Sequence, residues 1–288
     1  MKKVAWIGAG VMGRSMAGHL VKAGYELNVY NRTFAKALAL QEELGATACQ
    51  SIAEAVRGVD VVFTMLGYPS DVEEVYLGKG GVIESAPYSA ICVDMTTSSP
   101  SLAVELAERA QTRGMRVLDA PVSGGDVGAR NATLSIMVGG DPDAFAEVQP
   151  LFAALGRSVT YMGVAGSGQH TKAANQIAVA GATAAMTEAI VYAKGVGLDT
   201  QRMLDAIGGG AAGSWQITNM APRVLRGDFA PGFFVKHFIK DMEIILREAE
   251  SRGIPLAMLP SVLELYREMA RRGHGDLGTQ SLIRRYTE

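Results

Sequence analysis

Hydrophobic residues in the first half of the chain come in short continuous runs, each followed by a segment with helical spacing. Runs such as VAWI and VDVVFTML show no polar alternation, which is typical of strands buried on both faces of a sheet. Strands that alternate with helices in this way predict a parallel, doubly wound α/β sheet. The predicted strands are Lys3–Ile7, Leu27–Tyr30, Val59–Leu66, Ala90–Met95, Val117–Val122 and Leu134–Val138, and the predicted helices between them are Val11–Ala23, Phe34–Leu44 and Pro100–Thr112.

The pattern changes near Gly163, and no strand is predicted after Gly168. A long Ala-rich segment, Thr171–Val196, predicts one long helix without proline. Further helices are predicted at Thr200–Ile207, Val235–Ser251 and Pro260–Arg271. We therefore predict a mostly parallel sheet domain over residues 1–163 and an all-α domain over residues 164–288, joined by the long helix.

Composition narrows the classes of function. The chain has 288 residues, a length typical of about two domains. Its formal net charge is −2 and its pI about 6.1, so it lacks the basic excess of a nucleic-acid-binding protein. Two cysteines make no disulfide framework, and the four histidines have no metal-ligand spacing. No stretch reaches 18 unbroken apolar residues, so we expect no membrane span and a cytoplasmic protein.

A dinucleotide fingerprint follows the first predicted strand. It consists of Gly8, Ala9, Gly10, Val11, Met12 and Gly13. A GxGxxG that ends a strand, opens a helix and lies in a βαβ unit is a far stronger signal than the motif alone. The first glycine permits the sharp turn, the second lets the backbone approach a pyrophosphate, and the third allows close helix–strand packing. This predicts a Rossmann-like dinucleotide site.

The end of the second strand indicates which dinucleotide is preferred. NAD sites usually carry Asp or Glu there, which accepts a bond from the ribose 2′-hydroxyl. Here the strand ends in Asn31, Arg32 and Thr33. Neutral Asn31 does not repel a 2′-phosphate, Arg32 can pair with it, and Thr33 can donate a hydroxyl bond. We predict NADP as the preferred cofactor, with NAD used at lower efficiency.

Four separated motifs together resemble the β-hydroxyacid dehydrogenase superfamily, in its 3-hydroxyisobutyrate dehydrogenase and glyoxylate/succinic semialdehyde reductase branch. The resemblance covers essentially the whole chain. The motifs, in the expected order, are IGAGVMGRSMAGHL (7–20), DAPVSGG (119–125), GSGQHTKAANQ (166–176) and FFVKHFIKDM (233–242).

The residues also fit a substrate site on chemical grounds. Ser123, Gly124 and Gly125 can point a hydroxyl and successive N–H groups into one concavity, as a carboxylate receptor does. Lys172 and Asn175 are three residues apart on the long helix and share a face. A lysine among apolar neighbours releases its proton more readily, so it can act as a general acid/base. The resemblance assigns these roles: Ser-Gly-Gly binds the substrate carboxylate, Lys172 is the catalytic acid/base, and Asn175 positions the substrate.

The resemblance implies further cofactor contacts. It places Lys240 at the cofactor–substrate site and Thr97 near the nicotinamide. The segment from Leu66 to Pro69 is expected beside the adenosine half. His170 and His237 receive no catalytic role. Trp215 is either a wall of the substrate pocket or a core residue.

These features favour an NADP-preferring oxidoreductase that interconverts short β-hydroxyacids and their semialdehydes or 2-oxo acids. Alternatives within the class are an enzyme specific for 3-hydroxyisobutyrate or for tartronate semialdehyde (2-hydroxy-3-oxopropionate), and an imine-reductase-like activity, against which Lys172 argues. A non-catalytic NADP-binding scaffold would not need Lys172, Asn175 and Ser123 together. The helical domain is expected to hold substrate and to form a homodimer or homotetramer, with no nucleic-acid or membrane partner.

Overall fold

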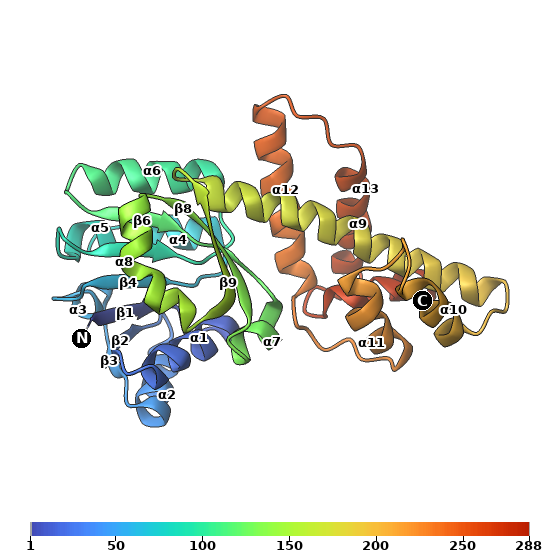
Figure 1. The fold of residues 1–288 in the computed structure, drawn as a ribbon, viewed down its shortest axis with the longest axis horizontal. Coiled ribbons are helices and arrows are strands. Elements are labelled where there is room, and N and C mark those ends of the chain that lie inside the picture. Colours follow the sequence, from blue (N-terminus) through green and yellow to red (C-terminus); the bar gives the residue numbers. More distant parts are fainter. Residues whose placement is uncertain (1, 288) are drawn as a thin grey trace. The chain divides into compact units, whose positions relative to one another are not determined.

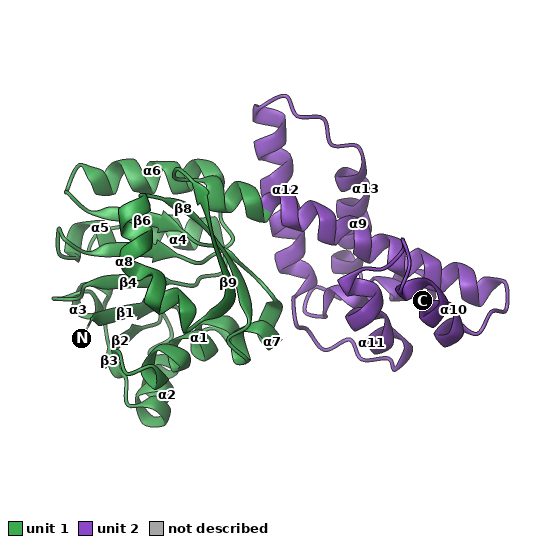
Figure 2. Cartoon of the chain, viewed as in Figure 1, with its two compact units in different colours: residues 1–172 green, residues 173–288 purple. Residues whose placement is uncertain are grey.

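The computed structural model describes residues 2–287, which form two compact units divided between Lys172 and Ala173 (Figure 2). The first unit is an α/β sheet domain and the second is helical (Figure 1). The predicted domain boundary lay at 163/164, whereas the division between the units lies inside the long helix α9 (Ser167–Gly195). The first turn of α9 therefore belongs to the sheet domain.

The first unit is built on a mostly parallel sheet, as predicted, and the described residues contribute nine strands to it. Its strand order is β3-β2-β1-β4-β5-β6-β8-β7, with β9 also paired to β8. All pairs are parallel except β6 with β8 and β7 with β8. The strands are β1 (Lys3–Ile7), β2 (Glu26–Tyr30), β3 (Thr47–Cys49), β4 (Val61–Thr64), β5 (Ile91–Asp94), β6 (Arg116–Asp119), β7 (Val122–Ser123), β8 (Leu134–Gly140) and β9 (Gly156–Gly163).

Helices cover both faces of this sheet, and a separate hydrophobic core lies under each set. One core joins β-strand residues such as Trp6 and Phe63 to α1, α2 and α8. The other joins Ile7 and Val62 to α4, α5 and α6. This is why the strands are apolar without alternation. The helices are α1 (Val11–Lys22), α2 (Phe34–Leu44), α3 (Ile52–Ala55), α4 (Pro69–Leu77), α5 (Val82–Ser85), α6 (Pro100–Gln111), α7 (Gly125–Arg130) and α8 (Pro142–Ala153).

The second unit packs its helices around the greater part of α9. One core joins Ala180 of α9 to α12 and α13, and the other joins Met186 and Ile190 of α9 to α10 and α11. No named strand lies in the described residues after 163, as predicted. The elements are α10 (Thr200–Gly208), η1 (Gln216–Met220), α11 (Ala221–Leu225), α12 (Val235–Ser251), α13 (Met258–Arg271), η2 (Thr279–Ile283) and α14 (Arg284–Thr287).

Helix α9 is also, among the described residues, the one helix long and apolar enough to cross a membrane by length and composition. The core helix of a soluble protein passes the same test, and α9 carries polar side chains on its buried face. Those include Gln169, Gln176, Thr183 and Thr187.

Candidate cofactor and active site

The three glycines of the fingerprint occupy three different environments. Gly8 has φ +105°, and a Cβ on it would lie 2.2 Å from the Met65 carbonyl oxygen. A Cβ on Gly13 would lie 2.0 Å from the Gly8 carbonyl oxygen. Gly10, by contrast, is exposed and has no atom within 4 Å of that position. The turn is thus closed on its protein side and open at Gly10, where a ligand's pyrophosphate needs room.

The N-terminus of α1 suits an anion. The first hydrogen bond of the helix runs from Arg14 N to Gly10 O, at 2.9 Å. The N–H groups of residues 11–13 therefore have no acceptor within the helix. No side chain caps Gly10, and no acidic residue lies in the first turn. These groups and the helix dipole fit the phosphates of a dinucleotide.

Asn31 has a structural bond that sequence reasoning did not anticipate. Its Oδ1 accepts from Ala9 N at 2.9 Å, and its Nδ2 donates to Thr33 O at 3.0 Å. Together with the bond from Gly8 N to Tyr30 O at 3.0 Å, this ties the fingerprint turn to the end of β2. The neutral side chain of Asn31 therefore also holds the fingerprint turn in place.

Arg32 lies beside it with an exposed side chain. Its Nη1 is 3.2 Å from Asp71 Oδ1, an ion pair to the first turn of α4. Asp71 Oδ2 also accepts from Tyr68 N at 3.1 Å, so this carboxylate caps the start of α4. Thr33 is the N-cap residue of α2, and its hydroxyl makes no capping bond.

The loops after β4 and β5 are joined to each other. Leu66 N donates to Thr96 Oγ1 at 2.9 Å, which links the segment that runs to Pro69 with the segment that carries Thr97. Thr97 is half-buried, whereas Thr96 and Ser98 on either side are buried. The loop therefore leaves Thr97 more accessible than its neighbours.

Three buried polar residues end adjacent parallel strands. Thr64 of β4, Asp94 of β5 and Asp119 of β6 are partners in register. Thr64 Oγ1 donates to Asp94 Oδ1 at 2.7 Å. Open α/β sheets bind ligands at the carboxyl ends of their strands. These three residues therefore place polar groups at the edge of the sheet where a ligand is expected.

Asp119 is a residue whose function the sequence analysis missed. Its Oδ1 accepts from Gly166 N and its Oδ2 from Gln169 N, both at 2.8 Å. Burial raises the pKa of this carboxyl to about 6, despite those bonds, with the nearby Asp94 as a smaller cause. The DAPVSGG motif contained it, but only the fold brings it to the start of α9.

Lys172 lies on the buried face of α9, with 7% of its surface exposed. It belongs to the same compact unit as the fingerprint and the Thr97 loop. Asn175, three residues further on, is half-buried and belongs to the helical unit. Lysine is among the residues least often buried in proteins, so this position is unusual for one.

Ser123 ends the two-residue strand β7, where it is in register with Ser135 of β8. Gly124 and Gly125 follow with φ +129° and +62°. Side chains rarely adopt such angles, so this turn requires both glycines. Gly128 N bonds to Gly124 O at 3.0 Å as α7 begins. The Ser-Gly-Gly segment thus lies in the first unit with Lys172 and Thr97.

In the helical unit a chain of polar contacts links α9 to α12. Asn175 Nδ2 donates to Gln176 Oε1 at 2.8 Å, and Gln176 Nε2 donates to Asp241 Oδ2 at 2.6 Å. Lys240 Nζ is 3.0 Å from Asp241 Oδ1. Since a carboxylate can only accept, Asp241 dictates which way both amides face. Asn175 and Lys240, both predicted from the motifs, are therefore tied into one network through Gln176 and Asp241.

The remaining candidates have other surroundings. His170 is exposed, and Trp215 has 61% of its surface exposed, so Trp215 is not a core residue. Burial lowers the pKa of His237, with the charges of Lys240 and Lys236 as further causes. No group of three or more His, Cys, Asp or Glu side chains in residues 2–287 could hold a metal ion.

Comparisons with known proteins agree with this architecture. Residues 3–163 match the family described as the NAD binding domain of 6-phosphogluconate dehydrogenase. Residues 166–286 match the family described as NAD-binding of NADP-dependent 3-hydroxyisobutyrate dehydrogenase.

Among similar proteins, the probable 3-hydroxyisobutyrate dehydrogenase-like 1 of Arabidopsis thaliana is 47% identical, over 98% of this chain and 84% of its own. The 2-hydroxy-3-oxopropionate reductase of Escherichia coli is 36% identical, over 98% and 96%. A solved 3-hydroxyisobutyrate dehydrogenase of Mycobacterium tuberculosis, with L-serine, is 30% identical over 100% of both chains, with a TM-score of 0.92. The fold, the fingerprint and these matches show that the chain is an NAD(P)-binding oxidoreductase of the 3-hydroxyisobutyrate dehydrogenase branch of the β-hydroxyacid dehydrogenase superfamily.

Proposed function

We propose that this protein is an NADP-preferring oxidoreductase that interconverts short β-hydroxyacids and their semialdehydes or 2-oxo acids. The observation that carries the proposal is the buried Lys172, which shares one compact unit with the fingerprint and with Ser123. A scaffold that only bound a dinucleotide would have no use for a lysine buried at this position.

The cofactor would be held by the fingerprint residues, with its phosphates at the N-terminus of α1 and its 2′-phosphate at Arg32. It supplies the hydride. Leu66, Pro69, Thr97 and Lys240 are proposed as further cofactor contacts.

The choice of NADP over NAD depends on a competition for Arg32. In the structure Arg32 pairs with Asp71 at 3.2 Å, through a side chain that is 81% exposed. Exposed ion pairs contribute about 0.2–1 kcal/mol, whereas hydrogen bonds to charged groups contribute about 1.5–3 kcal/mol. A 2′-phosphate should therefore displace Asp71 from Arg32.

In the reaction that we propose, Ser123 and the N–H groups of Gly124 and Gly125 bind the substrate carboxylate. Lys172 gives a proton to the carbonyl oxygen as the hydride reaches the carbon, and takes it back in the reverse direction. Asn175 hydrogen-bonds the same oxygen or the carboxylate. Gln176 and Asp241 fix its amide.

The experiment offers the protein a panel of short semialdehydes and 2-oxo acids, each with NADPH and with NADH. Turnover is measured as the loss of absorbance of the reduced nicotinamide. Succinic semialdehyde and glyoxylate test the leading assignment, and tartronate semialdehyde and the semialdehyde of 3-hydroxyisobutyrate test its runners-up. A cyclic imine in the same panel tests imine reduction. Binding of NADPH without turnover of any of these compounds would favour the scaffold.

A further inference from the structure

Gln169 joins the loop after β5 to the first turn of α9. Its Nε2 donates to Thr96 O at 2.8 Å, and its Oε1 accepts from Ser98 N at 3.0 Å. The residue is 2% exposed. One buried amide therefore binds the backbone on both sides of Thr97, in the way that a β-strand neighbour would.

The same residue is fixed at its own backbone. Gln169 N donates to Asp119 Oδ2 at 2.8 Å. Next to it, a Cβ on Gly168 would lie 2.4 Å from Met137 O and 2.6 Å from Asp119 O. The first turn of α9 is thus packed so closely against β6 and β8 that position 168 has no room for a side chain.

Lys172 follows Gln169 by three residues, so both side chains lie on the buried face of α9. The loop that carries Thr97 and the turn that carries Lys172 are otherwise separate in sequence by more than 70 residues, and Gln169 spans that separation directly. Both polar side-chain atoms of Gln169, Oε1 and Nε2, are used in this clamp.

We propose that Gln169 is a positioning residue, which holds the Thr97 loop and the Lys172 turn in one fixed geometry for hydride and proton transfer. This inference rests on the proposed function for the roles of Thr97 and Lys172. The clamp itself stands on the three bonds of Gln169 and can be tested without turnover.

The principal variant is Gln169→Met, which keeps an unbranched side chain of similar length and removes both side-chain bonds. The Ser98 amide should exchange its hydrogen faster, as seen by mass spectrometry of a peptide that covers the loop. With a substrate that the panel has identified, kcat should fall by about 10- to 100-fold, since a misplacement of about 1 Å can cost about 10²-fold. The Kd of NADPH should change by less than about threefold.

A loss of folded protein would also lower kcat, so a second readout is needed. If hydride transfer itself is slowed, the isotope effect on kcat should rise when NADPH carries deuterium at the transferred position. A smaller folded fraction leaves the isotope effect unchanged.

Gln169→Glu provides a rescue. A neutral carboxyl has one O–H donor and one carbonyl acceptor, which matches the amide pattern, whereas the ionised form cannot donate to Thr96 O. The carboxylates of Asp119 and Asp94, on neighbouring strands, further disfavour the ionised form. This variant should retain activity at low pH and lose it as pH rises, with an extra ionisation in its kcat profile that Gln169→Met lacks.

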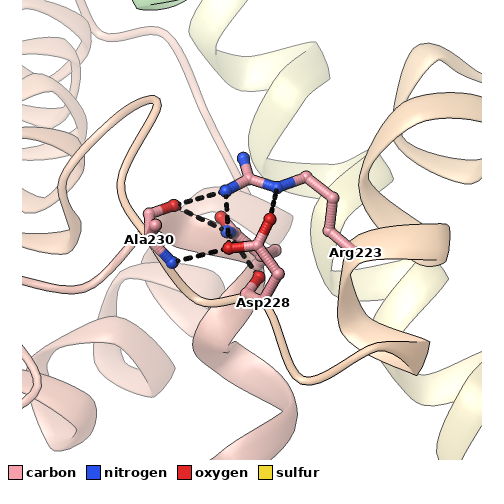
Figure 3. Close-up of polar contacts among 4 residues, drawn as sticks. Arg223, Asp228 and Ala230 are labelled. Atoms are coloured by element: carbon pink, nitrogen blue, oxygen red, sulfur yellow. Dashed lines mark hydrogen bonds and ion pairs between the residues drawn. The ribbon is translucent and has the colours of Figure 1, made fainter.

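Gln280→Met is the matched control. Gln280 is a fully buried glutamine of the helical unit whose Nε2 donates to Asp228 O at 3.1 Å and Ala230 O at 3.0 Å. It supports the loop where Arg223 pairs with Asp228 and bonds to Ala230 O (Figure 3). The control should lower Tm to a similar extent and leave the isotope effect and the exchange at Ser98 unchanged.

Unchanged exchange at Ser98 in Gln169→Met would overturn the clamp. Faster exchange with unchanged kcat and isotope effect would overturn the positioning role. If wild type turns over no compound of the panel, the proposed function fails, and the exchange at Ser98 still decides whether Gln169 holds the loop.

Discussion

Asn31 and Arg32 follow each other in the sequence, but their side chains are held in different ways. The Asn31 amide accepts from Ala9 N and donates to Thr33 O, whereas the Arg32 side chain extends into solvent and pairs with the carboxylate of Asp71. The neutrality of Asn31 was predictable from its identity. Its bond to Ala9 was not, because that bond depends on β2 lying beside β1.

Arg32→Asp should erase or invert the cofactor preference. We expect wild type to prefer NADPH over NADH by at least about tenfold in kcat/KM, from a charge-assisted contact of about 1.5–3 kcal/mol. The variant loses the partner and adds repulsion. Steady-state kinetics with both cofactors measures the ratio.

Arg109→Asp is the control for this prediction, because Arg109 is also an exposed, ion-paired arginine, on α6. It should leave the ratio unchanged. Equal use of NADH and NADPH by wild type, or an unaltered ratio in Arg32→Asp, would mean that the dinucleotide is discriminated elsewhere.

At the scale of elements, the N-terminus of helix α9 is held by the buried carboxyl group of Asp119. Asp119 accepts bonds from the backbone there, and its carboxylate faces the positive end of the helix dipole. Burial nevertheless raises its pKa to about 6 from an ordinary 3.8. The folded state therefore holds this proton more tightly than the unfolded chain does, and it loses that advantage as pH rises from about 4 to about 6.

Asp119→Asn tests this directly. The free energy of unfolding of wild type, relative to that of the variant, should fall by about 1–3 kcal/mol between pH 4 and pH 7. Urea unfolding of both proteins at several pH values measures the difference. A difference that stays constant, or that grows with pH, would contradict the raised pKa.

Elements with an unambiguous hydrophobic pattern were predictable, and those without one were not. β1 and α2 lie where the sequence placed them, because an apolar run or a helical stripe ends there in glycine. α8 was not predicted, since Pro150 inside it suggests a break, although Val148 and Phe152 on its buried face pack on the sheet. β9 was missed because most of its residues are exposed.

The residues of the candidate site likewise fall into those that the sequence predicts and those that it does not. Fingerprint, Ser-Gly-Gly, Lys172 and Asn175 are readable as motifs, because their chemistry resides in residue type and short spacing. Asp119, Gln169 and Gln176 act through partners 47 to 73 residues away. Such partners are known only once the strands and helices are in place.

At the scale of the whole molecule, α9 leaves an apolar stripe on its surface within the helical unit. Gly181 is used internally, since a Cβ on it would lie 3.1 Å from Met258 Cε. Tyr192 and Val196 are 69% and 55% exposed. The stripe recurs at helical spacing and consists of Ala178, Ala182, Ala185, Ala189, Tyr192 and Val196.

We expect this stripe to contribute to a homodimer or homotetramer, because exposed apolar surface of this kind is typical of an interface. Light scattering at micromolar concentration should give a mass of two or four chains. Ala185→Arg should lower that mass, and Glu250→Arg, on an exposed position of α12, should not. A monomeric wild type would contradict the expectation.

The central claim is that Lys172 carries the proton in a hydride transfer between a nicotinamide and a short hydroxyacid or aldehyde. The most direct test is single-turnover reduction by NADPH in wild type, Lys172→Ala and Lys194→Ala, the last an exposed lysine of the same helix. The rate should fall by about 10²–10⁴ in Lys172→Ala alone, with the Kd of NADPH little changed. Near-normal turnover in Lys172→Ala would remove Lys172 from the mechanism.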